Sequence, residues 1–169
     1  MTKFTSNTST ITNSWDTYWR GSGNAGAFSS GGVSHPVIIT FWLDFFELAK
    51  SNYKNPRIID IASGNGAVVE SALKVFEDNL KEITALDVST AAIKNINERY
   101  PKVKGVVTDA SSIPLDDGCF DIVTSQFGVE YAGIDAIFEA SRLVADRGLL
   151  TLLLHTESGS IHQECQKSL

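Results

Sequence analysis

The chain has 169 residues, a formal net charge of −6 at pH 7, 43% hydrophobic residues and 20% charged residues. This composition excludes a disordered chain, and the length suits one domain with a proper core rather than two ordinary ones. The acidic balance argues against a protein that grips nucleic acid mainly through phosphates, since such domains are usually basic. The two cysteines, Cys119 and Cys165, lie in no CxxC or His-rich segment. Neither a zinc site nor a disulfide framework is therefore expected, and both thiols are expected to be reduced.

The N-terminal third begins with a polar segment. Residues 1–14 are rich in Ser, Thr and Asn, so they are expected to form a mobile tail and not a signal peptide. Trp15, Tyr18 and Trp19 follow at helical spacing and predict a short helix. The Gly- and Ser-rich residues 21–34 are typical of a linker or hinge.

A second helix is predicted to open at Pro36, because proline is favoured in the first helical turn. Apolar residues recur every three or four positions over residues 37–51, which predicts one buried face. The apolar run of residues 37–49 contains Asp44 and Glu47 and is too short to span a bilayer. The two helices define a cap over residues 15–54, and the protein is expected to be cytoplasmic, with no membrane partner.

The remaining residues, 55–169, alternate between short apolar strands and amphipathic helices. Strands are predicted at residues 57–62, 82–88, 104–110, 120–127 and 149–155. Helices are predicted at residues 67–79, 90–100 (with Ser89 as the N-cap) and 134–144. This rhythm predicts an α/β fold with a doubly wound, Rossmann-like parallel sheet in the order 3-2-1-4-5.

The first strand runs into the glycine-rich segment IIDIASGNG, residues 58–66. Gly64 and Gly66 allow a tight turn and let a ligand lie against bare backbone. The following helix presents its N–H groups and positive dipole end to that ligand. A ligand site and an ordinary tight strand-to-helix turn both remain open at this point.

Two acidic residues end the next strands, where open α/β sheets bind ligands. Asp87 is placed to accept hydrogen bonds from both ribose hydroxyls of an adenosine, or else to be a solvated strand end or helix cap. Asp109 is placed to bond an adenine amino group, or else to form a simple Asx-turn. A dinucleotide oxidoreductase is disfavoured because Val69 stands where its fingerprint needs Gly or Ala, and no Gly-Lys-Ser/Thr follows for a phosphate loop.

The segments IIDIASGNG, TALDVS, VVTDASSIPLDDGCFDIV and SQFGVEY together resemble the class I S-adenosylmethionine-dependent methyltransferases of small molecules, of the methyltransferase type 11 kind. The resemblance covers roughly residues 55–155, with Ala62 standing where many relatives carry Gly. It implies S-adenosylmethionine as cofactor, S-adenosylhomocysteine as product, and no metal. It also implies cofactor contacts from Asp60, Ala62, Gly64, Gly66, Asp87, Val88, Asp109, Ala110, Gln126 and Phe127.

Methyl transfer needs alignment of the reacting groups, and a base only when the acceptor must lose a proton. Glu130 and His155, at the ends of the fourth and fifth strands, are the catalytic candidates, with surface or strand-end roles as the alternatives. Candidates for a substrate-contacting lid are the aromatic residues Trp15, Tyr18, Trp19 and Tyr131. The three on the N-terminal helix serve equally as a hydrophobic anchor for that helix.

The family's sheet normally continues past the fifth strand with a helix and an antiparallel hairpin, and these C-terminal strands are missing here. The fifth strand then has an open apolar edge, which predicts either a truncated chain or a homodimer over that edge. The predicted function is methyl transfer to a small-molecule acceptor at an O, N or C atom. The alternative is a non-catalytic S-adenosylmethionine- or S-adenosylhomocysteine-binding module or fragment. Methylation of nucleic acid or protein is disfavoured by the acidic balance and by the lack of an Asn-Pro-Pro-Tyr-like segment.

Overall fold

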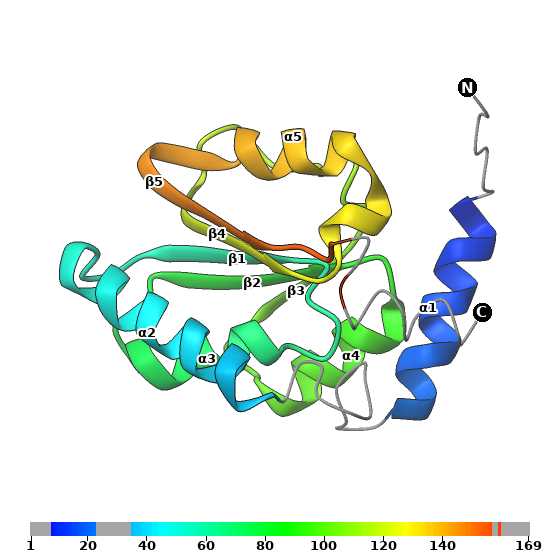
Figure 1. The fold of residues 1–169 in the computed structure, drawn as a ribbon, viewed down its shortest axis with the longest axis horizontal. Coiled ribbons are helices and arrows are strands. Elements are labelled where there is room, and N and C mark those ends of the chain that lie inside the picture. Colours follow the sequence, from blue (N-terminus) through cyan, green and yellow to red (C-terminus); the bar gives the residue numbers. More distant parts are fainter. Residues whose placement is uncertain (1–7, 23–34, 157–158, 160–169) are drawn as a thin grey trace.

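A computed structural model describes residues 8–22, 35–156 and 159 of the chain. Its centre is a parallel five-stranded sheet in the order β3-β2-β1-β4-β5, so the predicted fold and strand order are confirmed (Figure 1). The strands are β1 (Arg57–Ile61), β2 (Glu82–Asp87), β3 (Lys104–Val107), β4 (Phe120–Gln126) and β5 (Val144–Leu153). The helices are α1 (Thr8–Ser22), α2 (Pro36–Asn52), α3 (Ala67–Phe76), α4 (Thr90–Arg99), the 3-10 turn η1 (Val129–Ala132) and α5 (Ile134–Arg142).

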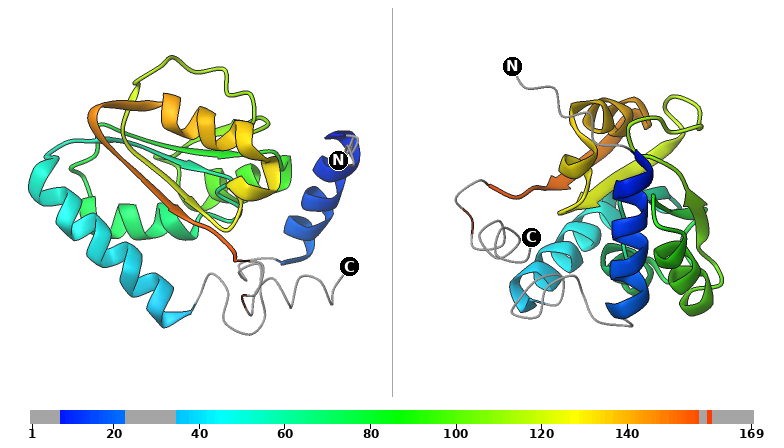
Figure 2. Two further views of the ribbon diagram at one scale, coloured as in Figure 1. Left: turned by 45° about the horizontal axis from the view of Figure 1, so that its top comes forward. Right: turned by 90° about the vertical axis from the view of Figure 1, so that its right-hand side faces the viewer.

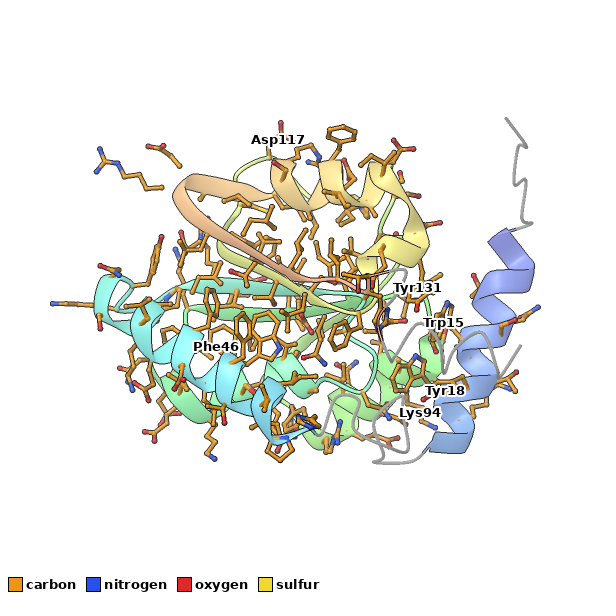
Figure 3. The ribbon with its side chains drawn as sticks, viewed as in Figure 1. Trp15, Tyr18, Phe46, Lys94, Asp117 and Tyr131 are labelled. Atoms are coloured by element: carbon orange, nitrogen blue, oxygen red, sulfur yellow. The ribbon has the colours of Figure 1, made fainter. Side chains whose placement is uncertain are left out.

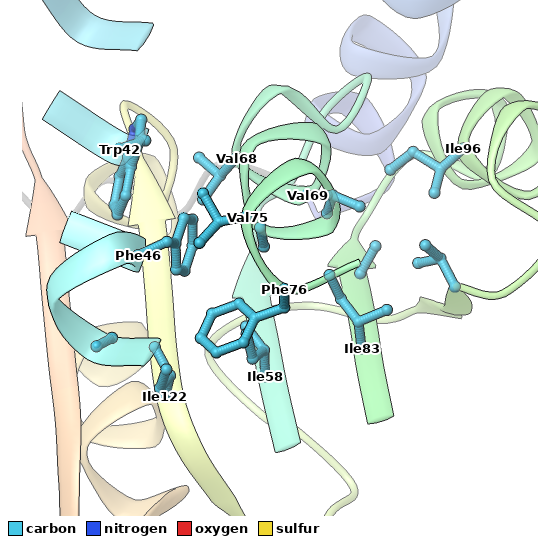
Figure 4. Close-up of a cluster of buried hydrophobic side chains, with 14 of the residues drawn as sticks. Trp42, Phe46, Ile58, Val68, Val69, Val75, Phe76, Ile83, Ile96 and Ile122 are labelled. Atoms are coloured by element: carbon cyan, nitrogen blue, oxygen red, sulfur yellow. The ribbon is translucent and has the colours of Figure 1, made fainter. Parts of the chain in front are cut away.

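Helices cover both faces of the sheet because successive strand residues point to opposite faces. Ile58 of β1 lies in a core with α2, α3 and α4, whereas Ile59 and Ile61 lie in a second core with α5. The first core contains the largest aromatic side chains, and Phe46 packs between Trp42 and Phe76 at ring distances of 5.9 and 6.1 Å (Figure 4). Because a core covers each face of the sheet, a ligand site is expected at the ends of its strands.

Local signals explain where two of the helices, α2 and α4, begin. Pro36 opens α2, as predicted, and the side chain of His35 accepts a hydrogen bond from the backbone N–H of Val37. Ser89 caps α4 by accepting the N–H of Ala92 at 3.2 Å, which confirms the predicted N-cap. Among the described residues, none of the helices combines the length and apolar character needed to cross a membrane.

Several boundaries differ from the sequence predictions, and three of them change the description of the fold. Helix α1 begins at Thr8, so residues 8–14 are helical and do not belong to a tail, whereas residues 1–7 and 23–34 lie outside the described residues. This polar segment has weak helix propensity, and the contacts of α1 with α4 come from Asp16 and Trp19, further along the helix. β3 ends at Val107, before Asp109 turns the chain, and β5 begins at Val144, directly after α5.

The outer strand β5 pairs with β4 alone in the described part of the chain. Leu150 on this strand is 38% exposed, in line with the apolar edge expected from the sequence. The homodimer over this edge stays a prediction.

Candidate functional site

The carboxyl ends of β1 and β2 meet at a tight turn that contains the glycines. Gly64 and Gly66 have φ angles of +50° and +83°, in the left-handed region that glycine adopts most easily. Ala62 also has a positive φ of +55°, a conformation that costs an alanine roughly 1 kcal/mol. The backbone of Gly128, after β4, lies directly against Ala62, because a Cβ on that glycine would stand 2.6 Å from the Ala62 Cβ. The turn is therefore packed between β2 and β4.

Asp87 is fixed at the end of β2, next to this turn. It is 6% exposed; its Oδ2 accepts the N–H of Gly64 at 2.8 Å and its Oδ1 accepts the N–H of Ser89 at 2.9 Å. Burial raises the pKa of the Asp87 carboxyl, and these hydrogen bonds oppose that rise. A carboxylate has about four lone-pair positions, so two accepted bonds leave Asp87 able to receive further donors.

Asp60 on β1 is the second acidic residue at this edge. It is 2% exposed and accepts a hydrogen bond of 2.9 Å from the hydroxyl of Thr124 on β4. Burial, with a smaller contribution from the charge of Asp87, raises the pKa of Asp60 to about 8. Asp60 is thus largely protonated at neutral pH and can donate as well as accept a hydrogen bond.

Asp60→Asn is expected to remove a pH dependence of stability. The pKa of Asp60 rises on folding from 3.8 to about 8, so its ionisation favours the unfolded chain. The free energy of unfolding of the wild type should be highest near pH 4 and fall by about 2 kcal/mol or more by pH 8, where it levels off. Urea unfolding across this range should show a shallower fall in the free energy of unfolding for Asp60→Asn, while the exposed Asp135→Asn variant follows the wild type. Parallel curves for wild type and Asp60→Asn would show that the buried carboxyl does not titrate as expected.

Asp109 and its neighbours lie beyond β3. The Oδ1 of Asp109 accepts both the backbone N–H and the hydroxyl of Ser111, each at 2.8 Å, so the Asx-turn named as the alternative is present. Ala110 is buried in the core beneath α5, and Val88 is half-buried between Asp87 and Ser89. Contacts of these three residues with an adenine ring stay a prediction.

A second group of side chains gathers at the ends of β4 and β5. The ring of His155 stacks on Phe127 at 4.5 Å with an interplanar angle of 10°. Its Nδ1 lies 3.1 Å from Oε1 of Glu130 and 3.0 Å from the hydroxyl of Tyr131. The backbone N–H of His155 also donates to Glu130 Oε1 at 3.1 Å. The structure therefore brings together Glu130 and His155, which the sequence named separately as catalytic candidates.

The other oxygen of this glutamate, Glu130 Oε2, is buried and has no hydrogen-bond partner among the described residues. A buried acceptor in that state is costly unless a donor reaches it, which favours a ligand or water at this position. Trp15 of α1 meets the edge of Tyr131 at 5.8 Å, and both point toward the same end of the sheet (Figure 3). This position therefore lies within an aromatic wall at the carboxyl edge.

The remaining candidates divide between the site and the core. Tyr18 makes edge contacts with Trp15 and Trp19, and Trp19 packs on Gly64. Gln126 accepts a hydrogen bond from the indole N–H of Trp42 on α2, and its expected place beside the methyl group stays a prediction. Its side chain is directed to α2 because that buried indole needs an acceptor.

Sequence reasoning missed Asp16. Its Oδ1 accepts the hydroxyl of Ser89 at 2.6 Å and the N–H of Ala91 at 3.1 Å, so a residue of α1 caps α4 from outside. The sequence contains no local signal for this contact, because the two partners are 73 residues apart. The signals for Asp87 and Ser89 are local, which is why both were found.

The site as a whole suits a ligand with hydroxyl groups and a flat ring system. Asp87 offers a carboxylate to hydroxyls, the turn at Gly64 offers bare backbone, and Asp60 offers a neutral carboxyl. In this structure the indole of Trp19 lies on the open face of Gly64. The chemistry of these residues therefore fits S-adenosylmethionine, and one aromatic side chain covers the glycine turn.

Known proteins agree with this reading. The family model described as "Methyltransferase domain" matches residues 59–152, more than half of the chain. The ubiquinone/menaquinone biosynthesis C-methyltransferase UbiE of Campylobacter jejuni is 30% identical over 121 residues, which are 67% of this chain and 51% of that protein. The demethylmenaquinone methyltransferase of Renibacterium salmoninarum is 33% identical over 73 residues, 43% of this chain and 29% of that protein. The chain thus spans about half the length of the first of these curated relatives, and less of the second.

Solved structures share the fold at low sequence identity. The [4+2]-cyclase SpnF has a TM-score of 0.64 at 20% identity, covering 87% of this chain and 60% of its own. The YcgJ protein of Bacillus subtilis has a TM-score of 0.57 at 19% identity, covering 67% and 50%. These likenesses support the fold alone, since one fold can support different reactions. With the family model matched across the glycine turn, Asp87 and the strands up to β5, the chain belongs to the class I S-adenosylmethionine-dependent methyltransferases.

Proposed function

We propose that this protein transfers the methyl group of S-adenosylmethionine to a small planar acceptor at the carboxyl edge of the sheet. The proposal rests on the observation that two groups of side chains lie at that edge. One is the Asp87 carboxylate bound to the N–H of Gly64, and the other is the stacked Phe127–His155 pair beside Glu130. Membership of the methyltransferase family supports the reading of the first group as the donor site.

The donor half is held by the first two strands. S-adenosylmethionine supplies an electrophilic methyl group on a sulfonium when it is bound. Asp87 would accept the ribose hydroxyls, Gly64 would provide bare backbone, and Asp60 would lie near the amino group. Gly66, Val88, Asp109 and Ala110, which follow β1, β2 and β3 in the chain, are further proposed contacts of the donor.

The side chains near the acceptor would remove a proton from it. We propose that His155 takes a proton from an acidic hydroxyl of the acceptor and that Glu130, 3.1 Å from Nδ1, stabilises the imidazolium formed. The rings of Phe127 and Tyr131 favour a flat acceptor. Relatives named for ubiquinone and menaquinone biosynthesis support a quinol-type ring as that acceptor and a ring carbon as the methylated atom.

Incubation with S-adenosylmethionine and a hydroxynaphthoquinol is expected to produce S-adenosylhomocysteine and a methylated ring, detected by mass spectrometry. A catechol and a primary amine serve as comparison acceptors. His155→Gln and Glu130→Gln should each lower kcat by about tenfold to a hundredfold and flatten its pH profile. The affinity for S-adenosylhomocysteine should stay unchanged in both, as in the exposed control variant Asp135→Asn.

Two results would contradict the proposal. If the protein binds S-adenosylhomocysteine but turns over no acceptor, the non-catalytic binding module is the better description. If His155→Gln lowers kcat without changing the shape of the pH profile, the histidine positions Phe127 or Tyr131 and does not take the proton.

A further inference from the structure

Helix α1 crosses the carboxyl edge of the sheet and lies beside α4 (Figure 2). Asp16 fixes it there, because its carboxylate accepts the hydroxyl of Ser89 and the N–H of Ala91 at the N-terminus of α4. Unpaired N–H groups and the positive end of the helix dipole make this a favourable place for a carboxylate. The side chain of Asp16 is 16% exposed, so solvent competes only partly for these bonds.

Trp19, one turn further along α1, covers the glycine turn. Its side chain is buried, with the whole residue 7% exposed, and an added Cβ on Gly64 would meet its ring atom Cζ2 at 2.4 Å. Asn95 of α4 strengthens this arrangement, because its amide reaches the carbonyl of Trp19 at 3.4 Å and the side chain of Asn65 at 3.0 Å. The indole therefore occupies the position where a side chain at Gly64 would begin.

The contacts of α1 also reach the residue that binds the donor. Ser89 donates its hydroxyl to Asp16 and its backbone N–H to Asp87. A single residue thus joins the α1 contact to the carboxylate of the donor site. Gly64 in the glycine turn and Asp87 beside it are thus both coupled to the position of α1.

We propose that α1 is a gate that competes with the methyl donor, with Asp16 as its latch and Trp19 as the group that blocks the Gly64 face. The inference rests on the proposed donor site at Gly64 and Asp87. A donor that lies against Gly64 and the indole of Trp19 need the same space, so the donor binds only after α1 leaves the turn. Donor affinity is then reduced by the fraction of molecules in which the gate is closed.

Calorimetric titration of the full 169-residue chain with S-adenosylhomocysteine tests the gate. Trp19→Ala and Asp16→Ala are each expected to tighten binding by about tenfold, because each weakens the closed state. Thr17→Ala, on the exposed side of the same helix, should bind as the wild type does. Circular dichroism checks that each variant is folded. If Trp19→Ala does not fold, Asp16→Ala still tests the gate, because the Asp16 side chain contributes little to the core. Weaker binding in folded Trp19→Ala and Asp16→Ala would overturn the gate and make α1 part of the binding surface.

Hydrogen exchange measured by mass spectrometry gives a readout independent of affinity. Adding S-adenosylhomocysteine to the wild type should increase exchange in peptides from α1 while it protects peptides of the glycine turn. Increased protection of both segments would overturn the gate, since α1 would then close over the ligand. If neither the wild type nor any folded variant binds, the donor site itself is wrong, and the gate fails with it.

Discussion

Asp87→Asn is expected to weaken binding of S-adenosylhomocysteine by about 30-fold to 100-fold. The carboxylate now accepts the N–H of Gly64 with one oxygen and that of Ser89 with the other. An asparagine has only one acceptor oxygen, so its NH₂ group must face one of these two N–H donors. It also lacks the charge that strengthens hydrogen bonds to ribose hydroxyls. Calorimetric titration of both proteins measures the change directly.

The control for this prediction is Asp116→Asn, which alters an exposed aspartate on the loop before β4. It should bind as the wild type does, and both variants should be folded by circular dichroism. Binding by folded Asp87→Asn within a factor of three of the wild type would place the ribose elsewhere. The assignment of β2 as the strand that holds the donor would then be wrong.

Arg142→Met is expected to lower the free energy of unfolding by about 2–4 kcal/mol. The guanidinium of Arg142, at the end of α5, donates to the carbonyls of Ile113 and Leu115 and to the carboxylates of Asp117 and Glu139. It therefore holds the loop after β3 against α5. Methionine retains much of the stem but none of these donors, which leaves the partly buried carbonyls and Glu139 without this partner. Urea unfolding of both proteins at pH 7 gives the difference.

The same cluster predicts a sensitivity to acid. The hydrogen bond from Arg142, helped by the N–H of Ile113, lowers the pKa of Glu139 from 4.5 to about 2. The stabilisation is present above pH 4.5 and is lost as the pH falls through about 2, because the unfolded chain takes up the proton first. The difference in free energy of unfolding between Arg142→Met and the wild type should narrow as the pH falls from 4.5 to about 2. The exposed control Lys54→Met should have the same free energy of unfolding as the wild type at every pH. A constant difference between pH 7 and pH 2 would show that Glu139 gains no stability from the arginine.

Much of the fold could be predicted because its signals are local. The apolar runs of the five strands, the glycines after β1 and the cap at Ser89 each act within a few residues of their position. The donor half of the site follows from them, because parallel strands bring Gly64 and Asp87 to one edge. The meeting of Glu130 and His155 also follows, because both come just after neighbouring strands.

The contacts that escaped prediction join segments with no local pattern. Asp16 resembles any exposed aspartate on a polar helix until α4 is placed beside it. Arg142 resembles a basic residue in the last turn of a helix, and only the fold brings Asp117 to it. The hydrogen bond between Gln126 and Trp42 escaped prediction for the same reason, because Trp42 lies on α2, 84 residues away.

The strand order has a consequence for how the chain folds. Gly64 and Asp87, 23 residues apart, come together within the single β1-α3-β2 unit, which closes a short loop. Asp60 and Thr124 are separated by 64 residues, so the pairing of β1 with β4 must close a far longer loop. The contact of Gly64 with Asp87 is therefore expected to form before the contacts between β1 and β4. The part of the site that contains Glu130 and His155 is completed last. Until β4 pairs with β1, this central strand has only β2 beside it.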